Sequence, residues 1–221
     1  MRKKVSLLVA LTLLAVCLAA GCGQKDGAGA WEAVENSVYV TRTMEVESAM
    51  VYTSAKGNEL YSPEEMAAFA KEQIEAFNRA QGRAGSVNKE GEEKLPVALK
   101  ESTLEGQTGK LVFEYATPGD FVRFAKETGD DSHSIESLSV SSVSEVRDAL
   151  SEYSMTTADG KAVSAEQAAK HGKYVALVFE GAGTVCTEGK IAYVSDGASP
   201  VTVKSSREAV TGEGKHCIIF K

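Results

Sequence analysis

The first 22 residues of the chain have a different pattern of hydrophobic and polar positions from the rest. Three basic residues at positions 2–4 precede an apolar run over residues 5–20, and small residues then lead to Cys22. A charged start, an apolar middle and a small-residue end are typical of a secretory signal peptide, which the mature protein loses. An uncleaved transmembrane helix is the alternative, but the run is shorter than the about 20 apolar residues that a spanning helix needs. The pattern therefore predicts a signal peptide over residues 1–21.

A short polar segment separates this leader from the rest of the chain. Residues 23–30 (GQKDGAGA) are rich in glycine and have no apolar period. Such a composition is typical of a flexible linker. The sequence therefore predicts a tether over residues 22–30 and a folded domain over residues 31–221, beginning at Trp31.

The first elements of the domain are predicted to be two strands and a helix. Residues 37–43 and 45–53 are rich in β-forming side chains and predict strands. Ser62 is suited to cap a helix, because Pro63 follows at the first helical position and Glu65 completes a capping box. Spacings of three and four place one apolar face on this helix: Met66, Phe69, Ala70, Ile74 and Phe77. Gly82 follows its predicted end, and residues 82–94 predict a loop.

The middle of the chain repeats this order. Strands are predicted over residues 96–104 and 110–116, with turn residues at 105–107 between them. A second helix is predicted from Pro118, capped by Thr117 and ended by Gly129. Residues 130–135 predict a loop. A third helix is predicted over residues 142–153, with Val146, Ala149, Leu150 and Tyr153 on one face.

The last part of the chain is predicted to be mostly β. A capping box at residues 164–167 opens a short helix that extends to Lys170. Strands are predicted over residues 174–179, 184–187, 190–194, 201–204 and 216–220. Strands and helices mix without a strict βαβ rhythm. The sequence therefore predicts a single α+β domain, with a mostly antiparallel sheet and a few amphipathic helices.

The charge of the chain limits its partners. The 221 residues include 24 basic and 31 acidic side chains, and the charged residues of the segment predicted to be removed are all basic. An excess of acid disfavours nucleic acid and anionic lipid headgroups as electrostatic partners. We expect the surface charge to keep the protein soluble, and we expect no binding to nucleic acid.

Two cysteines, Cys186 and Cys217, remain in the predicted domain. Both lie in predicted strands, and an exported protein is in a compartment where disulfides persist. Spacing alone does not establish a pair. The sequence leaves two alternatives open, a Cys186–Cys217 disulfide or two buried thiols.

Histidines and carboxylates offer little chemistry. Asp130, Asp131 and His133 lie within four residues of a predicted loop, but a metal site needs more ligands in fixed geometry. A solvated turn is the favoured interpretation. His171 is expected to stabilise a helix C-terminus. His216 is beside Cys217, and neighbours on a strand point to opposite faces, which disfavours a catalytic pair.

Other motifs do not indicate an enzyme. Residues 86–89 match S-x-x-K, but they lie in a glycine-rich loop, and the S-D-N and K-T-G elements of penicillin-binding enzymes are missing. We therefore predict neither catalytic residues nor a cofactor or metal site. Aromatic residues gather early in the domain, where they form either a core or a binding surface: Trp31, Tyr39, Tyr52, Tyr61 and Phe69.

The leader resembles the signal peptide and lipobox of bacterial lipoproteins, on the residues Leu18-Ala19-Ala20-Gly21-Cys22. The resemblance implies cleavage between Gly21 and Cys22 and a lipidated Cys22, with diacylglycerol and acyl chains such as palmitate. Cys17 fits less well, because the bulky Val16 precedes it. Two acyl chains hold a protein stably on a membrane, at about 0.8 kcal/mol per buried CH₂.

The domain resembles a group of uncharacterised lipoproteins from clostridia and related Firmicutes. The resemblance rests on residues 38–40, 48–52, 61–78, 109–117 and 189–195. It implies a lipid-anchored protein on the extracytoplasmic face of the cell membrane and carries no activity. We expect a non-enzymatic interaction module of the cell envelope, and the alternative is a lipoprotein that binds a small molecule or glycan for a membrane complex. An enzyme using Asp130, Asp131 and His133 is the least favoured hypothesis.

Overall fold

A computed structural model describes residues 31–54, 62–88 and 94–221. The predicted signal peptide, the cleavage site at Gly21 and Cys22, the tether and Tyr61 lie outside the described residues. The strands of the described part of the chain form two β-sheets, and this part also contains three α-helices and one short 3₁₀ helix.

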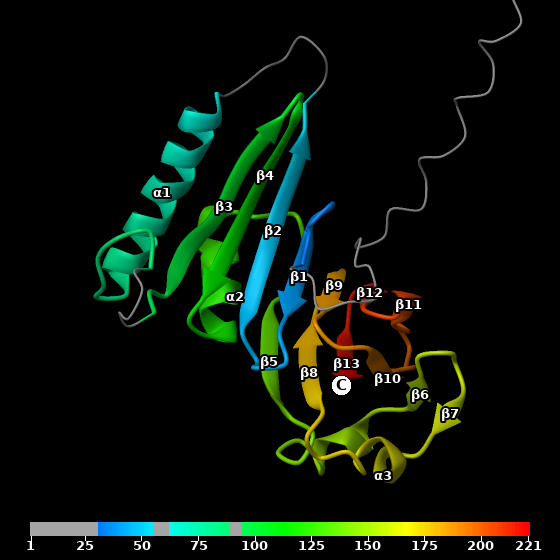
Figure 1. Cartoon of the computed structure of the whole chain (residues 1–221). Helices are drawn as coiled ribbons and strands as arrows, with labels where there is room; N and C mark the ends of the chain where they lie inside the picture. The colour runs from blue at the N-terminus through cyan, green and yellow to red at the C-terminus, as the bar shows by residue number, and fades with distance from the viewer. Residues whose placement is uncertain (1–30, 55–61, 89–93) are drawn as a thin grey trace, which may run out of the picture.

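The first sheet, sheet A, has seven strands in the order β11-β12-β9-β1-β2-β4-β3. All neighbouring strands are antiparallel except β1 and β9, which are parallel. The bounds are β1 Ser37–Val40, β2 Val46–Thr53, β3 Val97–Glu105, β4 Thr108–Tyr115, β9 Gly183–Thr187, β11 Thr202–Ser205 and β12 Glu208–Thr211. The strands β2, β4 and β3 extend far beyond the others, as the upper part of Figure 1 shows.

The second sheet, sheet B, has six antiparallel strands in the order β5-β8-β13-β10-β6-β7. Their bounds are β5 Ser137–Ser142, β6 Met155–Thr157, β7 Ala162–Val163, β8 Val175–Glu180, β10 Ile191–Ser195 and β13 Lys215–Phe220. Near the end the chain crosses between the sheets four times, from β8 to β9, from β9 to β10, from β10 to β11 and from β12 to β13. The described residues therefore have the α+β composition that the sequence predicts, with two sheets where one was predicted.

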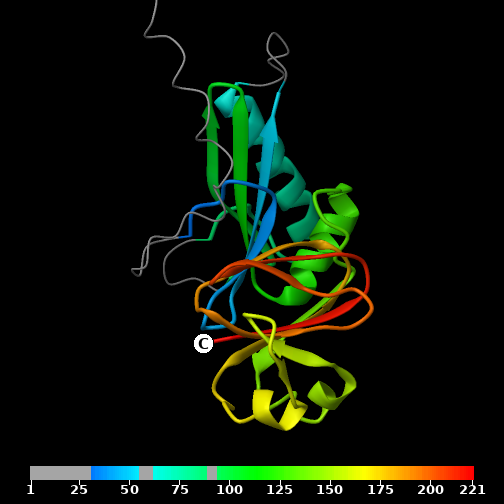
Figure 2. The ribbon, with the colours of Figure 1, turned by 90° about the vertical axis from the view of Figure 1, so that its right-hand side faces the viewer.

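Two amphipathic helices cover one face of sheet A. The helix α1 (Pro63–Ala80) packs on β3, and α2 (Pro118–Thr128) contacts β2, β3 and β4 and also β5 of sheet B. Figure 2 shows both helices on the same side of the long strands. The predicted start signals are confirmed: Ser62 and Glu65 form a reciprocal capping box, and the Thr117 side chain accepts from the Asp120 amide.

The main core lies between the two sheets and includes both helices. Its members come from sheet A, from α1 and α2, and from one face of sheet B; they include Val38, Phe113, Ile74, Phe121, Phe124, Leu177, Phe179 and Ile218. A second cluster covers the other face of sheet B, against the 3₁₀ helix Ala149–Glu152 and the short helix α3 (Ala165–Ala168). Sheet B is thus buried on both faces.

The prediction of a helix over residues 142–153 is wrong. Residues 137–142 form β5, which pairs along its length with β8, and only residues 149–152 are helical, as a 3₁₀ turn. The apolar spacing had a real cause, because Leu150 is buried in the second cluster and Val146 and Tyr153 pack against it. The strand β5, which the sequence did not predict, ends where the predicted helix would begin.

Three short strands were not predicted from the sequence, β6, β7 and β12. Each has two to four residues, too few to give a readable alternation. Within the described residues, the helices are too short or too polar to cross a membrane.

Candidate functional site

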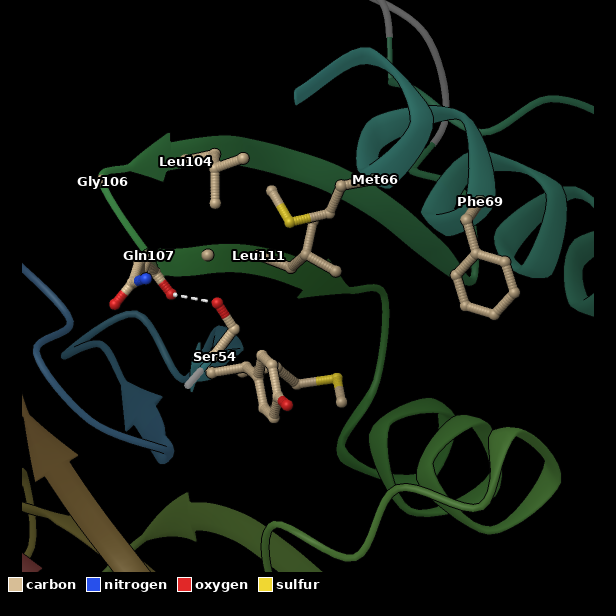
Figure 3. Close-up of a pocket in the computed structure, with 10 residues that line it drawn as sticks. Ser54, Met66, Phe69, Leu104, Gly106, Gln107 and Leu111 are labelled. Carbon is tan, nitrogen blue, oxygen red and sulfur yellow. Dashed lines mark hydrogen bonds between the residues drawn. The ribbon is translucent and has the colours of Figure 1, made fainter. Parts of the chain in front are cut away.

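A pocket lies between the first half of α1 and the far end of β2, β4 and β3. Its volume is about 210 Å³. Figure 3 shows ten described residues that line it: Met50, Tyr52, Ser54, Met66, Phe69, Leu104, Gly106, Gln107, Gly109 and Leu111. All ten are uncharged, and most are apolar.

The floor of the pocket is the helix-facing side of the three strands. Met50 pairs with Leu111 across β2 and β4, and Leu104 pairs with Gly109 across β3 and β4. Since side chains alternate along a strand, these residues share the face that carries Phe113 and Tyr115 into the core nearer the middle of the sheet. The pocket is therefore the outer continuation of the core surface.

The wall of the pocket comes from α1. Met66 and Phe69 are three residues apart and lie on one side of the helix. Met66 extends from α1 over the strands, and its Sδ would lie 2.9 Å from a Cβ placed on Gly109. The absence of a side chain at position 109 therefore lets the thioether lie close to β4. The buried part of α1 begins one turn later, at Ala70 and Ile74.

The turn between β3 and β4 lines one end of the pocket. Gly106 has a φ of +61°, and it occupies the first central position of a two-residue hairpin turn with Gln107, where glycine favours a type II′ turn. The Gln107 carbonyl accepts from the Ser54 amide at 2.9 Å and from the Ser54 hydroxyl at 3.5 Å. These bonds join the end of β2 to the turn.

The open side of the pocket has an aromatic rim. Tyr52 is 61% exposed and Phe69 is 54% exposed, and both line the same apolar pocket. A concave apolar surface with exposed aromatic groups at its edge is suited to binding an apolar group by removing it from water.

The sequence only partly indicated this site. Of the five aromatic residues that it singled out, Tyr52 and Phe69 line the pocket. Trp31 stacks on Tyr39 instead, with ring centroids 4.7 Å apart, on the opposite face of sheet A. The floor residues were missed, because Met50, Leu104 and Leu111 alternate like any strand that faces a core.

The structure brings Asp130 and His133 together and leaves Asp131 exposed. The His133 Nε2 lies 3.8 Å from the Asp130 Oδ2, and the two side chains are 7% and 8% exposed. Burial lowers the pKa of His133, and the Asp130 charge acts in the opposite direction. The prediction of a solvated turn is therefore wrong for these two side chains.

The other two histidines have structural surroundings. His171 stacks on Tyr174, with ring centroids 4.6 Å apart. His216 is fully buried, its Nε2 lies 2.7 Å from the Gly212 carbonyl, and its ring packs on Phe179. Cys217, its neighbour, points into the second core cluster. The two side chains face opposite sides of β13, as predicted.

Cys217 is a free, buried thiol, so the structure has no disulfide between Cys186 and Cys217. The two side chains face away from each other. Val185 points into the main core, so its neighbour Cys186 faces the outer side of sheet A, whereas Cys217 faces the outer side of sheet B. Burial raises the pKa of the Cys217 thiol to about 12.

Comparison with known proteins gives no further identification: no family model, curated protein or solved structure matches the chain. Over residues 31–54, 62–88 and 94–221, no three side chains of the metal-binding types are grouped to hold an ion. The candidate site therefore rests on the geometry of the pocket.

Proposed function

We propose that this protein is a lipid-anchored, non-enzymatic interaction module on the extracytoplasmic face of the cell membrane. In this proposal the pocket beside α1 receives one apolar side chain of a protein partner in the envelope. The observation that carries the proposal is the uncharged pocket of about 210 Å³ with Tyr52 and Phe69 exposed at its edge.

The volume favours a single side chain over a whole small-molecule ligand. Sites for drug-sized ligands have volumes of about 300–1,000 Å³, whereas an apolar cavity of about 150 Å³ is large enough for benzene. A pocket of about 210 Å³ therefore suits one aromatic ring or one branched aliphatic group. Protein interfaces commonly place such an anchor in a pocket near their centre.

The polarity of the pocket disfavours a glycan. Sugars are recognised by several converging hydrogen-bonding groups, and the polar side chains that line this pocket belong to Ser54, Gln107 and Tyr52. Two of its lining side chains are instead thioethers, Met50 in the floor and Met66 in the wall. Methionine side chains adapt their shape to different apolar partners at little cost. This supports a surface that accommodates a side chain.

The two sheets are proposed to form one domain. The main core takes residues from both sheets, and α2 contacts strands of both. Interdomain boundaries, in contrast, are crossed by few contacts. Anchoring through Cys22 is supported by the lipobox resemblance of the leader, and it would keep the pocket near partners at the membrane surface.

Binding of isolated apolar groups tests the pocket directly. The chain from residue 22 onward, with Cys22→Ser to prevent lipidation, is titrated with indole and with 4-methyl-1-pentanol while its backbone amide NMR signals are followed. We expect saturable shifts that are confined to the pocket, at residues such as Ser54, Met66 and Gln107. Shifts scattered over the surface, or no shifts at millimolar probe, would contradict the proposal.

A variant pair makes this test specific. Phe69→Ala removes part of the wall and should weaken probe binding several-fold. Val87→Ala removes a side chain of similar exposure, 52%, at a residue outside the pocket lining, and should leave probe binding unchanged. A glycan or nucleotide that gives a larger and saturable response would favour the alternative, a lipoprotein that binds a small ligand.

A further inference from the structure

The loop over residues 130–135 lies at the junction of the two sheets. It connects α2, which packs on sheet A, to β5 at the edge of sheet B. The bend at Gly181 and Ala182, where the chain passes from β8 to β9, lies against it. The turn that carries Glu213, between β12 and β13, also contacts it.

Ser134 makes the contacts across this junction. Its amide donates to the Ala182 carbonyl at 2.9 Å, and its hydroxyl accepts from the Ala182 amide at 2.8 Å. The same hydroxyl donates to a carboxylate oxygen of Glu213 at 2.5 Å. Gly181 passes so close that a Cβ there would lie 2.0 Å from the Ser134 carbonyl oxygen. Two of the connections between the sheets, β8 to β9 and β12 to β13, are thus attached to one residue of the loop.

His133 fixes the conformation of the loop on either side of Ser134. Its Nδ1 accepts a hydrogen bond from the Ile135 amide at 3.0 Å, which requires that Nδ1 carries no proton. The ring packs on Phe121 of α2, with centroids 4.8 Å apart, and Nε2 makes no hydrogen bond in the described structure. The geometry therefore accommodates the neutral imidazole.

We propose that this loop is an acid-sensitive clamp between the two sheets, in which protonation of His133 releases Ser134 from the bend at Ala182. A proton on Nδ1 would turn the acceptor of the Ile135 amide into a second donor facing it. The bond would be lost, and the loop would have to rearrange between α2 and β5. The pocket beside α1 is remote from this loop in sequence and is not required for the effect.

The charged groups around His133 set the direction of the effect. Asp130 is the nearest, and its carboxylate also accepts from the Ser132 amide at 2.9 Å. Glu213 approaches through Ser134, and the Tyr115 ring packs on Phe121, which also contacts the His133 ring. Glu136, which directly precedes β5, and Glu180, the last residue of β8, are exposed to solvent.

Burial of the ring outweighs the attraction of Asp130, and the pKa of His133 is lowered. The unfolded or opened loop, with a histidine pKa of about 6.5, therefore binds the proton better than the closed loop. The stability of the closed loop is therefore greatest above about pH 6.5, and it decreases as the pH falls below this value. Between pH 7.5 and 5.5 the population of the opened loop should rise by up to ~10-fold, if only the opened form binds the proton.

Hydrogen exchange of the full chain at the two pH values tests the clamp. After correction for intrinsic exchange rates, the protection of the Ser134, Ile135 and Ala182 amides should fall by up to ~10-fold at pH 5.5. The amides of β4, around Phe113, should keep their protection. Equal loss of protection in both places, or no loss in the loop, would overturn the proposal.

The variant His133→Asn separates the imidazole from other titrating groups. Its Oδ1 replaces Nδ1 as the acceptor for the Ile135 amide and does not titrate, so the loop should close at both pH values. His171→Asn, which alters the exposed histidine, should leave the wild-type dependence intact. Persistence of the dependence in His133→Asn would overturn the proposal. If His133→Asn does not fold, NMR titration of the wild-type ring decides: a pKa of 6.5 or higher would also overturn it.

Discussion

The side chain of Asn78 binds both backbone polar groups of Val97. Its Oδ1 accepts from the Val97 amide at 3.0 Å, and its Nδ2 donates to the Val97 carbonyl at 2.8 Å and to the Gly85 carbonyl at 2.8 Å. Asn78 is fully buried near the end of α1, and Val97 begins the edge strand β3. One amide thus joins the helix that forms the pocket wall to the strand that forms part of its floor.

Replacing Asn78 by alanine should therefore destabilise the protein strongly. The change leaves the buried polar groups of Val97 without partners, at about 1–3 kcal/mol for each group. We expect the free energy of unfolding in urea to fall by roughly 3 kcal/mol. Glu75→Ala, at an exposed position of the same helix, should change it by less than about 0.5 kcal/mol. Similar values for the two variants would show that the amide has no such role.

Gly181 is expected to tolerate no side chain. Its φ is +118°, and an added Cβ would lie 2.0 Å from the Ser134 carbonyl oxygen. Gly160 has a comparable φ of +84° but open space around it, so it provides a matched control. Gly160→Ala should cost about 1 kcal/mol, and Gly181→Ala should cost about 3 kcal/mol or more, because overpacking is added to the backbone cost. Thermal unfolding of the two variants measures the difference, and equal melting temperatures would contradict it.

Cys217 should not react with thiol reagents in the folded protein. Its thiol is buried, and burial raises its pKa to about 12, so the reactive thiolate is scarce near neutral pH. Alkylation with iodoacetamide, followed by peptide mass spectrometry, should find Cys217 unmodified in buffer and modified in denaturant. Modification in buffer at the rate of a free peptide thiol would show that this face of sheet B opens.

The anchoring proposal is tested separately from the fold. Cys22→Ser removes the residue that the lipobox resemblance assigns to lipidation. We expect the protein to leave the detergent-soluble membrane fraction, or to accumulate with its leader uncut. Cys17→Ser is the matched control and should fractionate like the wild type. Unchanged fractionation of Cys22→Ser would exclude Cys22 as the anchor.

Elements with strong local signals could be predicted from the sequence. The capped helices α1 and α2 begin where Ser62 and Thr117 predict, because capping depends on residues three positions apart. The turn at Gly106 was also predicted, because a glycine between two strand patterns is a local signal for a turn. In contrast, β5 was not predicted, because it forms through pairing with β8, which lies some forty positions later in the chain.

The pocket could be predicted only in part, again for a physical reason. Tyr52 and Phe69 were visible as aromatic residues close together in the sequence. The floor could not be recognised, because Leu104 and Leu111 have the same alternation as buried strand residues. Whether such a face is covered depends on the length of α1 relative to the strands, and the sequence pattern does not encode this. The separation of Cys186 and Cys217 by the two sheets is likewise a property of the tertiary arrangement.

Site-specific crosslinking in intact cells is the most direct test of the central claim, that the pocket receives a side chain of a protein partner. The photoreactive residue p-benzoylphenylalanine replaces Tyr52 at the rim or, as the control, the exposed Val87. We predict one defined protein adduct from position 52, none from position 87, and loss of the adduct when Phe69→Ala is added. No protein adduct from position 52, equal adducts from both positions, or an adduct that persists with Phe69→Ala would contradict the account.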